Sequence, residues 1–108
     1  MDITMIGKIT EYMMMKLVER KLGKYNITLM HFIPGRIRLQ SSEWKTNHAL
    51  VTRIVELLQV QSFVFSVQST KETGSLVITY DALYVTNIQE LETWFGVLDE
   101  VYTTKYVK

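Results

Sequence analysis

Two arginines at alternate positions, Arg36 and Arg38, are the residues of this sequence best suited to bind a ligand. Alternate side chains of a β-strand point to the same face, so the two guanidinium groups would lie beside each other. Each guanidinium offers a planar fork of N–H donors that suits a carboxylate or a phosphate. The spacing therefore predicts a partner-binding surface. The alternative is an ordinary solvated sheet face with acidic neighbours across the strands.

Pro34 and Gly35 stand directly before this pair, and Gln40 follows it, so all three join the candidate partner-binding residues. Proline cannot donate to a sheet ladder and glycine permits unusual backbone angles, which predicts a bulge or a sharp bend here. The bend would aim Arg36, and Gly35 would allow close approach of a partner backbone.

His31 and His48 are the only imidazoles, and the absence of cysteine excludes disulfides, thiolate metal sites and cysteine nucleophiles. A transition-metal site usually needs about three or four protein ligands. The spacing of His31, Glu43 and His48 allows a shared site without demanding one. A small-ligand, metal or haem sensor based on His31 is therefore the alternative function, and we predict no cofactor.

The sequence matches no enzyme template, and we expect no catalytic activity. Its glycines are isolated rather than gathered into a phosphate-binding loop, and there is no His-Glu-x-x-His motif. The net charge is only +1, and the predicted strand at 75–80 lacks paired aromatic residues. Both features argue against a nucleic-acid partner.

The composition fits one small domain, because 108 residues with 47% hydrophobic content can form a single core. Charged side chains interrupt the start of the chain, which is unlike a secretory signal. No stretch reaches the roughly 18 apolar residues of a membrane-spanning helix. We therefore expect a cytoplasmic protein whose membrane contact, if any, is peripheral.

Hydrophobic periodicity predicts three helices and several short strands. The predicted helices cover 3–23, 46–59 and 87–101. The predicted strands cover 25–40, with an interruption at Pro34 and Gly35, then 62–69 and 75–80. Residues 41–45 form a loop, and the tail at 102–108 is the fourth strand, at an edge of the sheet. Ile37 and Leu39 should face the core, with Arg36 and Arg38 on the opposite face. In the third strand, Phe63, Phe65 and Val67 should share one face.

Two successive strand–helix–strand units imply an α+β fold, the ferredoxin-like split βαβ sandwich, with a four-stranded antiparallel sheet and two helices on one face. Residues 25–108 would form this domain, and an amphipathic helix at 1–24 is added to it. The apolar stripe of that helix, Ile6, Ile9, Met13 and Leu17, is wide. It suggests a homodimer through the N-terminal helix, or contact with a membrane surface.

The run from His31 to Leu39, followed by a helix, the stretch Val60 to Val67 and the segment Thr73 to Asp81, resembles the cysteine-less branch of the heavy-metal-associated (HMA) domains. The resemblance covers residues 26–100, and Pro-Gly-Arg-x-Arg with an upstream histidine is its most specific piece. In that family the fold is ferredoxin-like. Related domains sit at the N-termini of heavy-metal-transporting P-type ATPases or stand alone, and some are associated with bacterial iron-storage compartments.

The metal-carrying branch of that family has a Cys-x-x-Cys pair in the loop after the first strand. The equivalent loop here, Gln40 to Lys45, has no sulfur ligand, so thiolate-based metal delivery is not implied. The resemblance then implies a non-catalytic adaptor in bacterial metal homeostasis, with iron as the expected metal. It would dock a transporter or a compartment component through the sheet face around Arg36 and Arg38.

Overall fold

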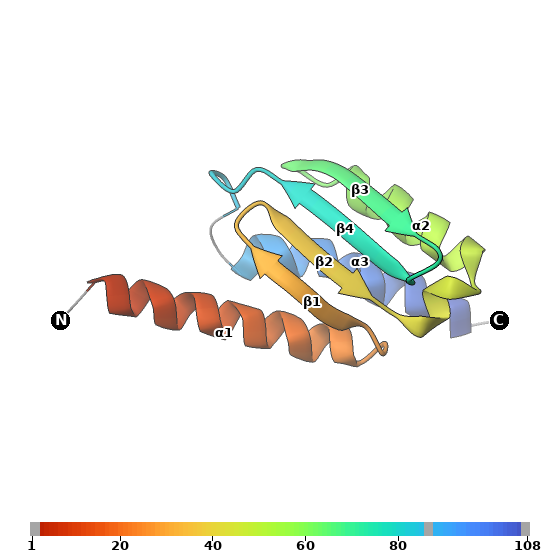
Figure 1. Ribbon diagram of the computed structural model, residues 1–108, viewed down its shortest axis with the longest axis horizontal. Coiled ribbons are helices and arrows are strands. Elements are labelled where there is room, and N and C mark those ends of the chain that lie inside the picture. The colour runs from red at the N-terminus through yellow and green to blue at the C-terminus, as the bar shows by residue number, and fades with distance from the viewer. Residues whose placement is uncertain (1–2, 86–87, 107–108) are drawn as a thin grey trace.

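The structure is a computed structural model that describes residues 3–85 and 88–106. Its elements follow in the order α1 (Ile3–Gly23), β1 (Thr28–Ile33), β2 (Arg36–Gln40), the 3-10 helix η1 (Ser42–Lys45), α2 (His48–Gln59), β3 (Val64–Thr70), β4 (Ser75–Tyr80) and α3 (Ile88–Tyr106). The strands form one antiparallel sheet in the order β1-β2-β4-β3 (Figure 1). The predicted α+β, ferredoxin-like arrangement with an added N-terminal helix is confirmed.

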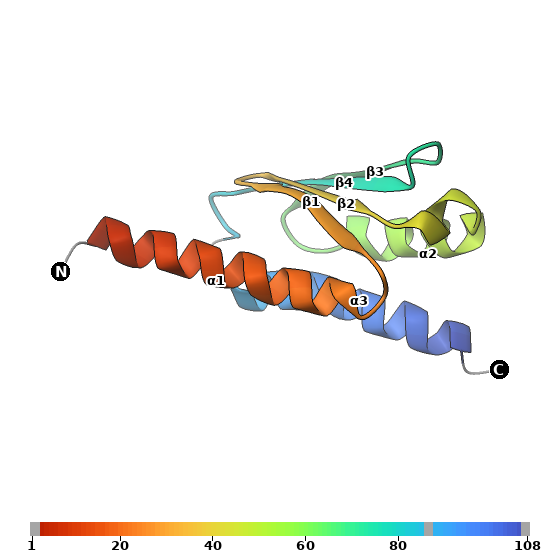
Figure 2. The same cartoon turned by 60° about the horizontal axis from the view of Figure 1, so that its bottom comes forward.

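The helices lie on one side of the sheet, and no described element covers the other side (Figure 2). The two central strands supply fully buried side chains to the helical side, Ile37 and Leu39 from β2 and Leu76 and Ile78 from β4. They pack against helix residues that are also almost fully buried: Ile54 and Leu58 of α2, and Phe95 and Leu98 of α3. Burial of each such side chain stabilises the fold by about 1.5–3 kcal/mol. The sheet therefore has one closed face and one open face.

The bend predicted at Pro34 and Gly35 is a complete chain reversal. These residues join β1 and β2 as a tight hairpin in which Ile33 lies opposite Arg36. Gly35 has φ +87, and proline followed by such a glycine is typical of a type II turn. Residues 25–40 are therefore two paired strands, whereas the sequence predicted one broken strand.

The predicted edge strand at 102–108 is wrong as far as Tyr106, because α3 continues to that residue. Val101 and Tyr102 are buried, and the Tyr102 ring stacks on Tyr25 with 4.4 Å between centroids, so these side chains pack along a helix. Residues 107 and 108 lie outside the described part of the chain. The edge position beside β2 is held instead by β1, which precedes β2.

The predicted loop at 41–45 contains η1, which is anchored in the core. Trp44 is buried and its Nε1 donates to the Tyr102 hydroxyl at 3.1 Å. The amide of Ser41 donates to the Gly74 carbonyl at 2.9 Å, which joins this loop to the β3–β4 turn. Gly74 adopts φ +63, and a Cβ there would stand only 2.5 Å from the Ser41 carbonyl oxygen. Glycine is therefore required at this contact.

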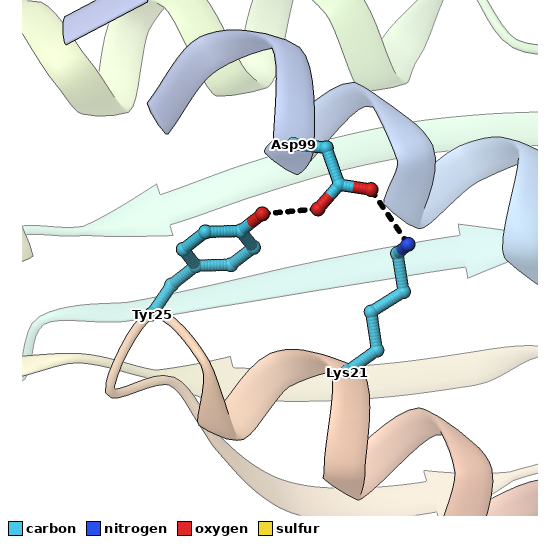
Figure 3. A network of polar contacts seen from close by, with 3 residues as sticks. All are labelled: Lys21, Tyr25 and Asp99. Atoms are coloured by element: carbon cyan, nitrogen blue, oxygen red, sulfur yellow. Dashed lines mark hydrogen bonds and ion pairs between the residues drawn. The ribbon is translucent and has the colours of Figure 1, made fainter. Parts of the chain in front are cut away.

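A polar network fixes the C-terminal end of α1 to α3 (Figure 3). Lys21 Nζ lies 2.7 Å from Asp99 Oδ2, and the Tyr25 hydroxyl donates to the other oxygen of the same carboxylate. The hydrogen bond from Lys21, followed by that from Tyr25, lowers the pKa of Asp99. Burial, followed by the hydrogen bond to Asp99, raises the pKa of Tyr25 to about 12.

The apolar residues of α1 and of β3 differ in burial along each element. On α1, Val18 and Leu22 are buried, whereas Met13 and Leu17, two residues of the predicted apolar stripe, are 56% and 41% exposed. The prediction that Phe63, Phe65 and Val67 share one face is wrong, because Val67 is buried and the two phenylalanines are exposed. In β3, the register shifts between Val64 and Ser66, so an extra residue, Phe65, stands in the strand and is 69% exposed. Such a bulge changes the alternation of faces, which periodicity alone does not reveal.

Candidate functional site

The open face of the sheet carries the arginine pair. In β2, Ile37 and Leu39 are fully buried against the helices, whereas Arg36 and Arg38 are half-buried on the opposite face. The predicted orientation of all four side chains is confirmed. The alternation follows from the period of two in a strand, because burying the isoleucine and leucine leaves the arginines outside.

Strand register defines the neighbours of each arginine. Arg36 lies opposite Ile33 of β1 and Thr79 of β4. Arg38 lies opposite His31 of β1 and Val77 of β4. We call the surface formed by Arg36, Arg38 and His31, together with the exposed apolar residues Met30 and Ile33 of β1 and Phe65 of β3, which lies beyond β4, the basic face.

The basic face lacks carboxylates. None of the residues in β1, β2, β3 or β4 is Asp or Glu. Among the residues that the structure describes, neither Arg36 nor Arg38 has a side-chain hydrogen bond or an ion pair. The acidic cross-strand neighbours of the alternative hypothesis are therefore not found in the strands. Two guanidinium charges remain available for an external anion.

Arg38 has an unusual environment, because its Nε is buried without a hydrogen-bond partner. An unsatisfied buried donor costs about 1–3 kcal/mol, and more where it belongs to a charged group. An acceptor that drew the guanidinium outward would allow Nε–H to form a hydrogen bond. An anionic ligand that reaches this side chain can therefore supply an acceptor that the described residues do not.

Pro34 and Gly35 position the basic face. Their turn brings β1 alongside β2, and the Gly35 carbonyl accepts a hydrogen bond from the Tyr80 amide at 3.0 Å. The Tyr80 hydroxyl in turn donates to the Ile33 carbonyl at 3.3 Å. Burial raises the pKa of this hydroxyl, so it stays a donor. The turn before Arg36 is therefore fixed by two hydrogen bonds from Tyr80, one to Gly35 and one to Ile33.

Gln40 has an intramolecular role. Its Nε2 donates to the carbonyl of Thr73 at 2.8 Å, in the β3–β4 turn. This bond supports the junction of Ser41 and Gly74. The structure thus occupies the amide group of Gln40, and we leave it out of the basic face.

The two histidines lie apart in the fold. His31 is exposed in β1, whereas His48 begins α2 beyond η1. Among the side chains that the structure describes, no three His, Asp or Glu residues come close enough to hold a metal ion together. The loop that would carry thiolates in the metal-binding branch is filled by the buried indole of Trp44. His31 therefore belongs to the basic face as a neighbour of Arg38.

Sequence reasoning missed the apolar border of this face. Met30 is 50% exposed and Ile33 44% exposed, and Phe65 projects from its bulge. Met30 stands at a register shift between Leu29 and His31, just as Phe65 does in β3. The bulges place Met30 and Phe65 outward, whereas Ile33 faces outward because it pairs in register with Arg36. No signal in the sequence marks a bulge of this kind, although the surplus of apolar residues in short strands is visible.

Two cavities lined by described residues lie elsewhere, and neither includes Arg36 or Arg38. One, of about 170 Å³, lies between α1 and α3 with Leu17, Val18 and Phe95 among its walls. The other, of about 240 Å³, lies between η1, α2 and the β3–β4 turn, beside Trp44 and His48. None of the helices described by the structure is long and apolar enough to span a bilayer.

Comparison with known protein families gives one match. Residues 13–93 match the family described as Heavy metal associated domain 2. This range includes the whole sheet, the basic face and the C-terminal half of α1. Searches of curated proteins and of solved structures found no match to the chain. Since the match covers most of its length, the chain belongs to the Heavy metal associated domain 2 family.

Proposed function

We propose that this protein is a non-catalytic docking module of a metal-handling system, and that a protein partner binds to the basic face. The observation that carries the proposal is the pair of arginines on an open sheet face without a carboxylate in any strand. The family to which the chain belongs supplies the link to heavy metals.

The chemistry of the described residues favours docking over metal transport. A carrier needs ligands that converge, and no such group of His, Asp and Glu exists in the described ranges. The chain also has no cysteine. A protein-binding surface combines exposed apolar area with polar groups that can pair with the partner. It also needs a rigid element that holds these groups in place. The central strands, the border of Met30, Ile33 and Phe65, and the two arginines provide these three features.

The partner we propose is a transporter or a component of a storage compartment, and the metal we propose is iron. Both come from the resemblance to the HMA domains rather than from the geometry. The alternative, a sensor based on His31, has no group of three His, Asp or Glu ligands among the described residues to support it. We therefore keep docking as the leading function.

Capture of partners from cells of the source organism tests this function. The tagged protein is compared with the double variant R36A/R38A and with the control R20A/R53A, which removes the same charge from α1 and α2. Circular dichroism and a melting curve confirm that all three are folded. We expect at least one partner protein to be captured by the wild type and by R20A/R53A but not by R36A/R38A. Equal recovery by the two double variants would rule out docking through the basic face.

A further inference from the structure

The spacing of Arg36 and Arg38 sets the spacing of the anionic groups that can bind them together. The two residues are separated by one position in β2, so their Cα atoms are about 6.6–6.8 Å apart along the strand. An extended peptide repeats its side chains on one side at the same interval. We infer that the basic face binds an extended acidic segment of a partner protein, with carboxylates at alternate positions. This inference rests on the proposed function.

The guanidinium groups favour carboxylates in such a segment. Each can bind one carboxylate through two parallel N–H···O bonds, which fixes direction as well as charge. Neither arginine is engaged by a side chain in the described part of the molecule, so no internal ion pair must be broken first. For Arg38, the bound carboxylate also gives the buried, unpaired Nε an acceptor once the side chain turns outward.

Apolar contacts around the arginines select a protein segment. Ile33 lies directly opposite Arg36, and Met30 stands at the bulge beside His31, which lies opposite Arg38. Both side chains are about half exposed. Each carboxylate of the bound segment would therefore lie near one of these two apolar side chains. The segment therefore carries apolar side chains next to its acids. Beside Arg36 on β4, the hydroxyl of Thr79 forms a hydrogen bond of 2.5 Å with the hydroxyl of Ser66 on β3. These two polar groups therefore already have a partner within the protein.

A nucleic acid fits this face less well. Binding of a phosphate backbone needs several cations along a track and aromatic side chains on which bases stack. The described strands offer two arginines and one exposed aromatic residue that stands at a bulge, Phe65. Other cations, such as Arg20 and Lys24, line the cavity between α1 and α3 and so cannot extend the track.

Fluorescence anisotropy with two labelled nonapeptides tests the inference. One places glutamates at alternate positions between apolar residues, and the other has the same composition with its glutamates adjacent. We expect the alternating peptide to bind the wild-type protein about tenfold more tightly, the gain of one well-placed ionic contact. The R36A/R38A variant should lose this binding, R36K/R38K should lose most of it because lysine lacks the fork, and R20A/R53A should keep it.

Three results would overturn the inference: equal affinity for the two peptides, retention of binding by R36A/R38A, or equally tight binding of an oligonucleotide of the same charge. Failure here is distinguishable from failure of the proposed function. If neither peptide binds while R36A/R38A still loses its cellular partner, the acidic segment is wrong and docking through the basic face stands. If the partner is also retained, both are wrong.

Discussion

Lys21 Nζ lies 2.7 Å from Asp99 Oδ2, and this ion pair ties the end of α1 to α3 although the two residues are 78 positions apart in sequence. Tyr25 binds the same carboxylate from the loop that leads into β1. The network therefore anchors to α3 the loop that precedes β1, and β1 carries His31 and Ile33 of the basic face. The α1 helix is in this way connected to the candidate site.

Replacing Asp99 should weaken this connection. The side chain of Asp99 is 44% exposed, so solvent screens the pair, and we expect D99N to lower the free energy of unfolding by about 1 kcal/mol. The control E92Q removes a carboxylate from the same helix and should cost less. Urea unfolding at neutral pH measures both. Equal stability of D99N and the wild type would show that the network contributes nothing.

The stability supplied by Asp99 should depend on acid pH. Its pKa in the folded protein is lowered, chiefly by the hydrogen bond from Lys21, so the ionised form is favoured by folding. This stabilisation is complete above the ordinary pKa of about 4 and is lost as the pH falls through the lowered value. The stability difference between wild type and D99N should therefore shrink as the pH is lowered towards 2. A difference that grows in acid would contradict the assignment.

Tyr25 should produce the opposite dependence at alkaline pH. Its pKa in the folded protein is raised to about 12, first by burial and then by the bond to Asp99, so the protonated phenol is favoured by folding. The resulting stabilisation is present below pH 10 and is lost between about 10 and 12. Ultraviolet titration of wild type minus Y25F should show one phenol that ionises near 12. A midpoint near 10 would mean that Tyr25 is not held by the network.

Gly74 should tolerate no side chain. The G74A substitution places a Cβ 2.5 Å from the Ser41 carbonyl and forces alanine to φ +63. We expect a loss of at least about 2 kcal/mol, since the left-handed conformation and the clash each contribute. G23A is the matched control, because a Cβ there meets nothing within 4 Å, and it should be neutral or slightly stabilising. Similar melting temperatures for the two variants would refute the close approach at Ser41.

Metal titration separates docking from the alternative function of a sensor. Calorimetry with Zn²⁺ and Fe²⁺ is carried out on the wild type, H31A and H48A. The lack of a converging ligand cluster in the described residues predicts no stoichiometric binding that depends on either histidine. Binding of one equivalent that H31A abolishes would favour the sensor.

The sequence predicted the parts of the fold that depend on local periodicity. The bounds of α1, the orientation of β2 and the packing of α2 follow from side chains that repeat along one element. It could not predict the hairpin at Pro34, because a proline–glycine pair is compatible with a bend and with a full reversal. Only the pairing of Ile33 with Arg36 distinguishes them.

The sequence predicted the two arginines of the candidate site but not the exposed apolar residues beside them. Arg36 and Arg38 face outward because the buried residues between and after them fix the alternation. Met30 and Phe65 are exposed through bulges, which depend on how neighbouring strands pair and leave no pattern in one strand. The tail of α3 is helical because Tyr102 packs on Tyr25, a contact that connects distant parts of the chain.

The most direct test of the central claim is a map of amide chemical-shift changes on the folded, isotope-labelled protein as the alternating acidic peptide, or the captured partner, is added. We predict that the changes concentrate in β2 and its neighbours β1 and β4, with the largest at Arg36 and Arg38 and none of that size in the R36A/R38A variant. Changes that concentrate instead at Leu17, Lys21 and Phe95, around the cavity between α1 and α3, would contradict docking on the basic face.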